Sequence, residues 1–295
     1  MANAISGTTH QFSTPYLTLA EYKNAPTAMD YDNLVVGGNA AAQDAELANV
    51  IARASSWIDT YCNQILGATS ESEQQRTRIK SDGTIRFHPR YNPVIALTSM
   101  AYGTDPNNLT VAGDCSIAWI EDQQIIFPYA SLSTTFSSQG PLQFGFPSTA
   151  GFETFIKYTY VNGYANTTLG SVSAGDTVVS VISGVGITAG QMLKIYDGVY
   201  SENVTVASTY VFGSNTVPIV SPLAYAHSSG VSISALPPAV KEAAILVTSA
   251  FIKVRGDNSL VMGVTTRGVT SPGSQNLGTD LGMAEQLLKP FRRIR

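Results

Sequence analysis

The sequence predicts an α+β fold: a helical core with two long packed helices and a small β-sheet, into which an all-β domain, a small barrel or sandwich, is inserted. Two patterns of apolar residues, at 236–257 and 43–66, predict the long helices. Both repeat at i, i+3, i+4 and i+7, the spacing of one buried helix face. Between them in the chain, five short β-rich runs separated by glycine-rich turns predict the inserted domain at 165–235. The expected domains are therefore 1–164 together with 236–295, and 165–235.

Composition restricts the class of protein. Charged residues make up 13% of the 295 residues, against the roughly 25% usual in soluble domains, and hydrophobic residues reach 44%. We therefore expect part of the surface to be covered by other protein subunits. No run approaches the roughly 18 apolar residues of a membrane span, and residues 1–16 lack the basic start and apolar core of a secretory signal. A net charge of -4 disfavours a dedicated nucleic-acid binder.

The N-terminal region begins with a polar arm at residues 1–15. Thr18 and Glu21 then form a capping box, which predicts a short helix through Asn24. The helix predicted at 43–66 has one apolar stripe and one polar side, and Gly67 ends it. Cys62 on this stripe and Cys115 are expected to be reduced, structural thiols in a cytosolic compartment.

The middle of the chain predicts a sheet. The polar run SESEQQ, at residues 70–75, predicts a loop. Alternating residues at 152–161 predict a half-buried strand, and further short strands are expected near 76–80, 84–87, 94–102, 116–120 and 124–127.

The C-terminal region follows the helix predicted at 236–257. Residues 256–278 are rich in glycine, serine and threonine and predict a linker. A last short helix is expected from residue 279 or 280 to Lys289 and ends before Pro290. Its apolar side is formed by Leu281, Ala284, Leu287, Leu288 and Phe291.

No arrangement of residues points to catalysis or to a bound cofactor. The three histidines, His10, His88 and His227, are far apart, none is at metal-ligand spacing, and each is expected at the surface or in a turn. Catalytic and phosphate-binding motifs are absent from the sequence, and the glycine-rich run at 184–190 leads into a strand rather than a helix. We therefore expect no enzyme activity, no metal and no cofactor.

The order of several segments resembles the head–tail connector, or adaptor, proteins of long-tailed bacteriophages. The terminal pattern L-L-x-P-[FY]-R-R at 287–293 adds specificity, and the resemblance covers most of 16–164 and 236–295. The domain at 165–235 departs from the family pattern. The segments that carry the resemblance are TLAEYK, SSWIDTYCNQIL, NPVIALTSMAYG, FIKYTYVNGY, LPPAVKEAAILVTSAFIKVRGD and AEQLLKPFRRIR.

The resemblance implies a structural virion protein at the neck, on the portal vertex, that is present in the host cytoplasm during assembly. It implies a ring of about a dozen copies between the portal protein and a tail or neck protein of the stopper or terminator class. DNA would pass through the bore without sequence-specific binding, and no membrane is involved. The residues expected to bind the portal are Leu287, Leu288, Lys289, Phe291, Arg292, Arg293 and Arg295. A second, partly apolar stripe of the 236–257 helix indicates that this helix either lies inside a bundle or contacts another subunit. For the second case we expect a subunit interface at Ile245, Ile252 and Arg255, and Glu71 and Glu73 are expected to line the DNA channel.

An alternative function places the activity in the inserted domain. A carbohydrate- or receptor-binding tail or adhesin protein would use its aromatic residues, Tyr196, Tyr200, Tyr210, Phe212 and Tyr225. Such aromatics also serve as core or turn residues. A hydrolase is disfavoured, because neither an acid pair nor a nucleophile with its base is evident in the sequence.

Overall fold

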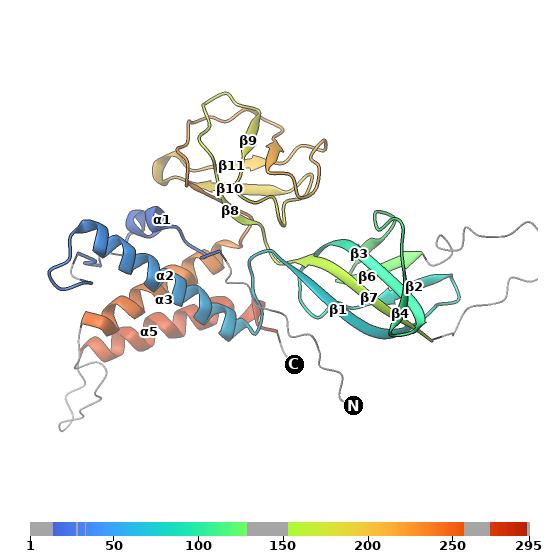
Figure 1. The fold of residues 1–295 in the computed structure, drawn as a ribbon. Coiled ribbons are helices and arrows are strands. Elements are labelled where there is room, and N and C mark those ends of the chain that lie inside the picture. Colours follow the sequence, from blue (N-terminus) through green and yellow to red (C-terminus); the bar gives the residue numbers. More distant parts are fainter. Residues whose placement is uncertain (1–13, 28, 33, 129–152, 257–271, 294–295) are drawn as a thin grey trace, which may run out of the picture. The chain divides into compact units, whose positions relative to one another are not determined.

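The structure is a computed structural model that describes residues 14–27, 29–32, 34–128, 153–256 and 272–293 (Figure 1). It contains four sheets, and strands account for 35% of the chain against 26% for helices. The protein is therefore mostly β. The predicted fold class, a helical connector core with two long packed helices, is wrong.

Strand β1 (Thr69–Arg78) shows one physical reason for this error. The run SESEQQ, predicted to be a loop, forms the middle of this strand, which pairs antiparallel with β7 (Glu153–Asn162) along its whole length. Polar side chains at both alternating positions give no period-two hydrophobic signal. The partner strand supplies the backbone hydrogen bonds and the buried side chains that β1 lacks in its own sequence.

The chain forms two compact units, of which the first comprises Ala68–Gly163. Its four-stranded sheet has the order β1-β7-β3-β4, and a three-stranded sheet has the order β2-β6-β5. The two sheets share one hydrophobic cluster that includes Ile85, Phe127 and Ile156. The remaining strands are β2 (Thr84–Phe87), β3 (Val94–Asp105), β4 (Asn108–Val111), β5 (Trp119–Glu121) and β6 (Gln124–Pro128).

The second unit comprises Gln11–Gly67 and Tyr164–Arg295 and contains the described helices. These are α1 (Leu19–Asn24), α2 (Ala40–Cys62), α3 (Pro238–Gly256), α5 (Pro272–Leu288) and the 3-10 helices η2 (Gly198–Tyr200) and η3 (Lys289–Phe291). The predicted capping box is confirmed at α1, where Thr18 and Glu21 exchange hydrogen bonds between side chain and backbone. Helix α5 begins inside the predicted linker, and residues 257–271 lie outside the described part of the chain.

Helices α2, α3 and α5 lie side by side (Figure 1) and share one hydrophobic cluster. Helix α5 was expected to be a short terminal segment, yet it supplies Ala284 and Leu288 to this cluster, and both are fully buried. The cluster thus depends on a third helix, of which the sequence predicted only the C-terminal part. Its other helical members are Tyr22 of α1, Leu47, Val50, Ile51, Ala54, Ile58 and Cys62 of α2, and Val240, Ala243, Ala244, Val247 and Ile252 of α3.

Residues 165–235 form a β module within the second unit. A four-stranded sheet has the order β11-β10-β13-β8, and β12 pairs with β9. The module encloses a hydrophobic cluster separate from that of the helices, with Leu193, Ile195 and Val217 at its centre. The strands are β8 (Asn166–Thr168), β9 (Val178–Ser180), β10 (Met192–Tyr196), β11 (Glu202–Thr205), β12 (Thr216–Pro218) and β13 (Ser232–Ser234).

Deletion of the module is expected to leave the helices folded. The Ala235 N–H donates to the Ala165 carbonyl oxygen over 2.8 Å, so the two ends of the module already meet. Replacing residues 166–234 with a Gly-Ser link shortens the loop and lowers its closure cost by about 2–3 kcal/mol. Far-ultraviolet circular dichroism of the deletion variant should retain the helical signal. Loss of that signal would show that the helices need the module in order to fold.

Candidate functional site at the C-terminal end

The C-terminal residues predicted to bind a portal fold onto the chain's own helices. Leu288 is fully buried in the cluster of α2, α3 and α5, and Leu287 and Phe291 are half-buried against it. This short apolar segment was expected to bind the portal. In the structure it orders on its own chain, because α2 and α3 provide the apolar surface that a short helix in water lacks.

Hydrogen bonds to backbone carbonyls fix the C-terminal segment to the C-terminal end of α2. The last carbonyls of a helix have no partner within the helix, and the Cys62 carbonyl accepts from the Arg293 N–H over 2.9 Å. The Gln64 side-chain amide donates to the Phe291 carbonyl at 2.9 Å. On the same end of α2, the Tyr61 hydroxyl donates to the Glu285 carbonyl at 3.1 Å. The segment is therefore held at three points.

The basic side chains of this end differ in their surroundings. Lys289 and Arg292 are exposed, and the Arg292 guanidinium lies 5.4 Å from the centre of the Tyr61 ring, close enough for a cation–π contact. Arg293 is half-buried and has an interaction partner. Arg295 lies outside the described residues. We use the name C-terminal face for the surface formed by Leu287, Lys289, Phe291 and Arg292.

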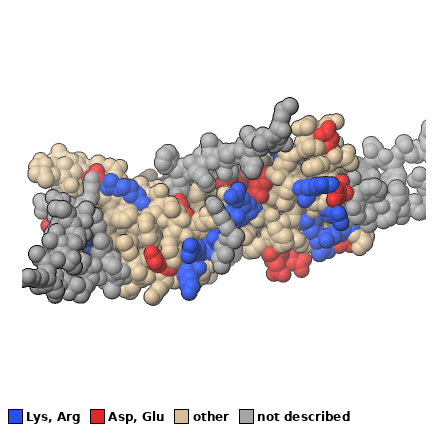
Figure 2. All heavy atoms as spheres, turned by 90° about the horizontal axis from the view of Figure 1, so that it is seen from below, with Lys and Arg blue, Asp and Glu red and all other residues tan. Residues whose placement is uncertain are grey.

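Elsewhere the described charges are largely interleaved. On the face drawn in Figure 2, Lys and Arg side chains lie among Asp and Glu side chains rather than in one continuous field. In the first unit, Arg76 and Arg78 both pair with Glu153, and Arg86 pairs with Asp82. This part of the surface therefore offers no extended basic field of the kind that binds nucleic-acid phosphates.

Glu71 and Glu73 lie on strand β1, so their expected placement in a loop is wrong. Glu71 is buried, and Glu73 accepts hydrogen bonds from the Tyr158 hydroxyl at 2.9 Å and the Tyr160 hydroxyl at 2.5 Å. The Arg90 N–H also donates to Glu73, at 3.0 Å. Burial, together with the charge of Glu73, raises the pKa of both tyrosines well above the ordinary value. The Glu73 carboxylate thus anchors two core tyrosines, while the channel role of both acids stays a prediction.

The second stripe of α3 contributes to the chain's own core. Ile252 is buried in the helical cluster and Ile245 is half-buried against it. The side chain of Arg255 lies outside the described residues. The apolar character of α3 could reflect burial within a bundle or contact with another subunit. Burial within the bundle accounts for these two isoleucines. Their role in a subunit interface stays a prediction.

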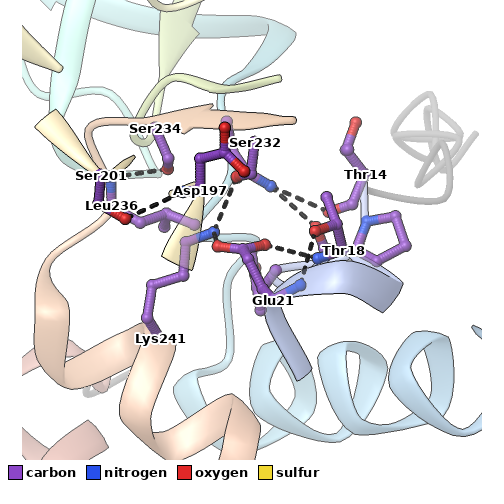
Figure 3. A network of polar contacts seen from close by, with 12 residues as sticks. Thr14, Thr18, Glu21, Asp197, Ser201, Ser232, Ser234, Leu236 and Lys241 are labelled. Carbon is purple, nitrogen blue, oxygen red and sulfur yellow. Dashed lines mark hydrogen bonds and ion pairs between the residues drawn. The ribbon is translucent and has the colours of Figure 1, made fainter. Parts of the chain in front are cut away.

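A buried ion pair joins helices α1 and α3, and its lysine also contacts the β module (Figure 3). The Lys241 Nζ of α3 lies 2.7 Å from Glu21 Oε1 of α1, and both side chains are only 6% exposed. The same ammonium donates to the Ser232 hydroxyl of β13 at 3.1 Å and lies 4.5 Å from the centre of the Tyr196 ring. Burial lowers the pKa of Lys241, although Glu21 opposes this shift. The sequence signal for this contact, a lone lysine on the apolar face of a helix, was missed.

His227 also differs from expectation. It was predicted to be a surface or turn histidine, yet its side chain is fully buried between two carboxylates of the β module. Nδ1 lies 2.8 Å from Asp197 Oδ2, and Nε2 lies 2.9 Å from Glu202 Oε1. The three residues are up to 30 positions apart in sequence, so no local spacing could have indicated the contact. We use the name His227 clamp for these three side chains.

Comparisons with known proteins find no family model, no curated protein and no solved structure that matches the chain. In the described part of the chain, no group of three or more His, Cys, Asp or Glu side chains is placed to hold a metal ion. None of the helices that the structure describes is both long and apolar enough to cross a membrane.

Proposed function

We propose that the chain is a structural virion protein that joins the capsid portal to the tail of a long-tailed bacteriophage. It assembles as a ring of about a dozen copies, contacts a tail or neck protein on its other side, and lets DNA pass without sequence-specific binding. The order of the sequence segments and the terminal pattern at 287–293 suggest this function. The observation that carries it is the C-terminal face, where basic side chains project from a segment pinned to α2.

The geometry changes how this face would bind. Leu288 is buried and stabilises the segment rather than touching a partner. The exposed contacts are the charges of Lys289 and Arg292, beside the half-buried side chains of Leu287 and Phe291. Because the segment is already ordered, binding costs less conformational entropy than ordering a free tail would. The matching portal surface is apolar at its centre and acidic at its rim. Attraction between these acids and the basic side chains then sets the association rate and the register of the two surfaces.

Removing the two exposed charges is expected to weaken portal binding. Lys289→Gln combined with Arg292→Gln should slow association with portal rings of the parent particle, and the difference from the wild-type chain should shrink at high salt because screening removes the same attraction. Surface plasmon resonance at two salt concentrations measures both effects. Lys23→Gln combined with Arg53→Gln removes two ion-paired charges from α1 and α2 and serves as the control.

The same variants separate docking from an alternative role in which the arginines hold DNA in the bore. That alternative predicts unchanged portal binding and a defect only in DNA retention. Equal association rates for the Lys289/Arg292 variant and the control would rule out the docking role of the C-terminal face.

A further inference from the structure

Exposed apolar side chains concentrate in the β module. Of the large hydrophobic side chains that are exposed in the described residues, 10 of 15 lie between residues 165 and 235. These residues are Val178, Ile182, Val185, Met192, Val199, Tyr200, Val211, Phe212, Val220 and Tyr225.

Two of them are tyrosines in contact with each other. Tyr200 is 55% exposed and Tyr225 is 42% exposed. Their ring centres are 5.4 Å apart and the ring planes are tilted by 58°. Tyr200 ends the 3-10 helix η2 (Gly198–Tyr200), and Tyr225 lies in the loop that leads to His227. The pair therefore presents aromatic faces to solvent from two separate loops.

The His227 clamp holds both loops in place. The Tyr225 N–H donates to Glu202 Oε1 at 3.1 Å, and the Ala224 N–H donates to Glu202 Oε2 at 2.9 Å. On the other loop, the Tyr200 N–H donates to the Asp197 carbonyl at 3.0 Å. Burial by itself raises the pKa of the Glu202 carboxyl, but the Ala224 N–H and the His227 ring stabilise the carboxylate, and the net pKa lies below its ordinary value. The backbone at both tyrosines is thus fixed by hydrogen bonds to residues of the clamp.

We propose that Tyr200 and Tyr225 form a binding site for a neutral saccharide. The C–H face of a pyranose ring packs on a tyrosine face, while its hydroxyls donate to acceptors at the edge of the site, where the Asp197 side chain is 31% exposed. Rings held in place before binding lose little entropy on association, which suits a shallow stacking contact.

The charges around the pair favour a neutral ligand. Two acids, Asp197 and Glu202, flank Tyr200 in the sequence, and from Asn203 to Val240 the sequence contains no Asp, Glu, Lys or Arg. Both Glu202 oxygens are engaged by the clamp and the two loop N–H groups, and Asp197 Oδ2 lies 2.8 Å from His227 Nδ1, so both carboxylates already have partners within the module. A wholly apolar partner would leave the tyrosine hydroxyls without hydrogen bonds. A ligand with an apolar face and a hydroxyl edge satisfies both the tyrosine rings and the tyrosine hydroxyls.

A printed array of bacterial surface polysaccharides and of plant and animal glycans, probed with the full chain, tests this proposal. We expect at least one saccharide class to bind. In calorimetric titrations with that saccharide, Tyr200→Ala and Tyr225→Ala should each weaken binding about tenfold, the loss typical of an aromatic anchor. Tyr200→Phe should retain most of the affinity because it keeps the ring.

Phe212→Ala is the matched control, because Phe212 is an aromatic of the same module with 40% exposure, and it should bind like the wild-type chain. Absence of binding across the array, or an equal loss in Phe212→Ala, would overturn the proposal. Displacement of the saccharide by a lysine-rich peptide would instead assign the pair to a cationic partner. Portal association of the tyrosine variants should be unchanged, so this site and the proposed connector function can fail separately.

Discussion

Replacing Leu288 with alanine is expected to lower the free energy of unfolding by about 2–5 kcal/mol, the range for removing a large aliphatic side chain from a packed core. Leu288 is 0% exposed and lies in the cluster that joins α2, α3 and α5. The cavity left by the substitution would lie between helices. The flanking backbone contacts hold these helices in place, which limits how far the cavity can close. Urea denaturation followed by circular dichroism measures the change.

Met283 provides the control for this substitution on the same helix. It is 53% exposed, so Met283→Ala should change the stability by no more than about 0.5 kcal/mol. If Leu288 instead serves only as a free contact for a partner, the two variants would have the same stability. That result would contradict the folded arrangement of the C-terminal end.

Replacing Lys241 with methionine is expected to cost about 3–5 kcal/mol, because it leaves the Glu21 carboxylate buried without its counter-charge. The pair is almost fully enclosed, and the ammonium also donates to Ser232. Adding Glu21→Gln should restore part of the loss, since a glutamine carries no charge and still offers an oxygen to the Thr18 N–H. Denaturation of the single and double variants gives the coupling between the two residues.

The exposed pair of Lys23 and Asp44 is the matched comparison. Their side chains are 30% and 39% exposed, so Lys23→Met should cost only about 0–1 kcal/mol. Equal losses at Lys23 and Lys241 would show that the Lys241–Glu21 pair is not sealed from water.

The sequence predicts those parts of the structure whose signal is local. The capping box at Thr18 and Glu21 depends on contacts three residues apart, and the apolar stripes of α2 and α3 repeat every turn. The prediction for strand β1 was wrong because the stability of this strand comes from β7, which follows it by about 80 residues. Counting only the strong helical patterns therefore overstated the helical share of the chain.

The functional residues were harder to predict for the same reason. The pattern at 287–293 identifies an apolar side and a basic end, but it does not show that Leu288 packs against α2 and α3 of its own chain. The His227 clamp joins two stretches of chain that lie 25 to 30 residues apart, and Lys241 contacts a partner 220 positions away. The aromatic set of the insert included Tyr200 and Tyr225, yet only the fold distinguishes this exposed pair from Tyr210, which is buried with its hydroxyl bonded to backbone carbonyls.

Electron microscopy of the purified chain mixed with portal rings of the parent particle tests the proposed function most directly. A connector that docks through the C-terminal face predicts rings of about a dozen copies stacked on the portal, with occupancy reduced by Lys289→Gln combined with Arg292→Gln. Portal rings that stay bare while the wild-type chain remains monomeric would contradict the proposal.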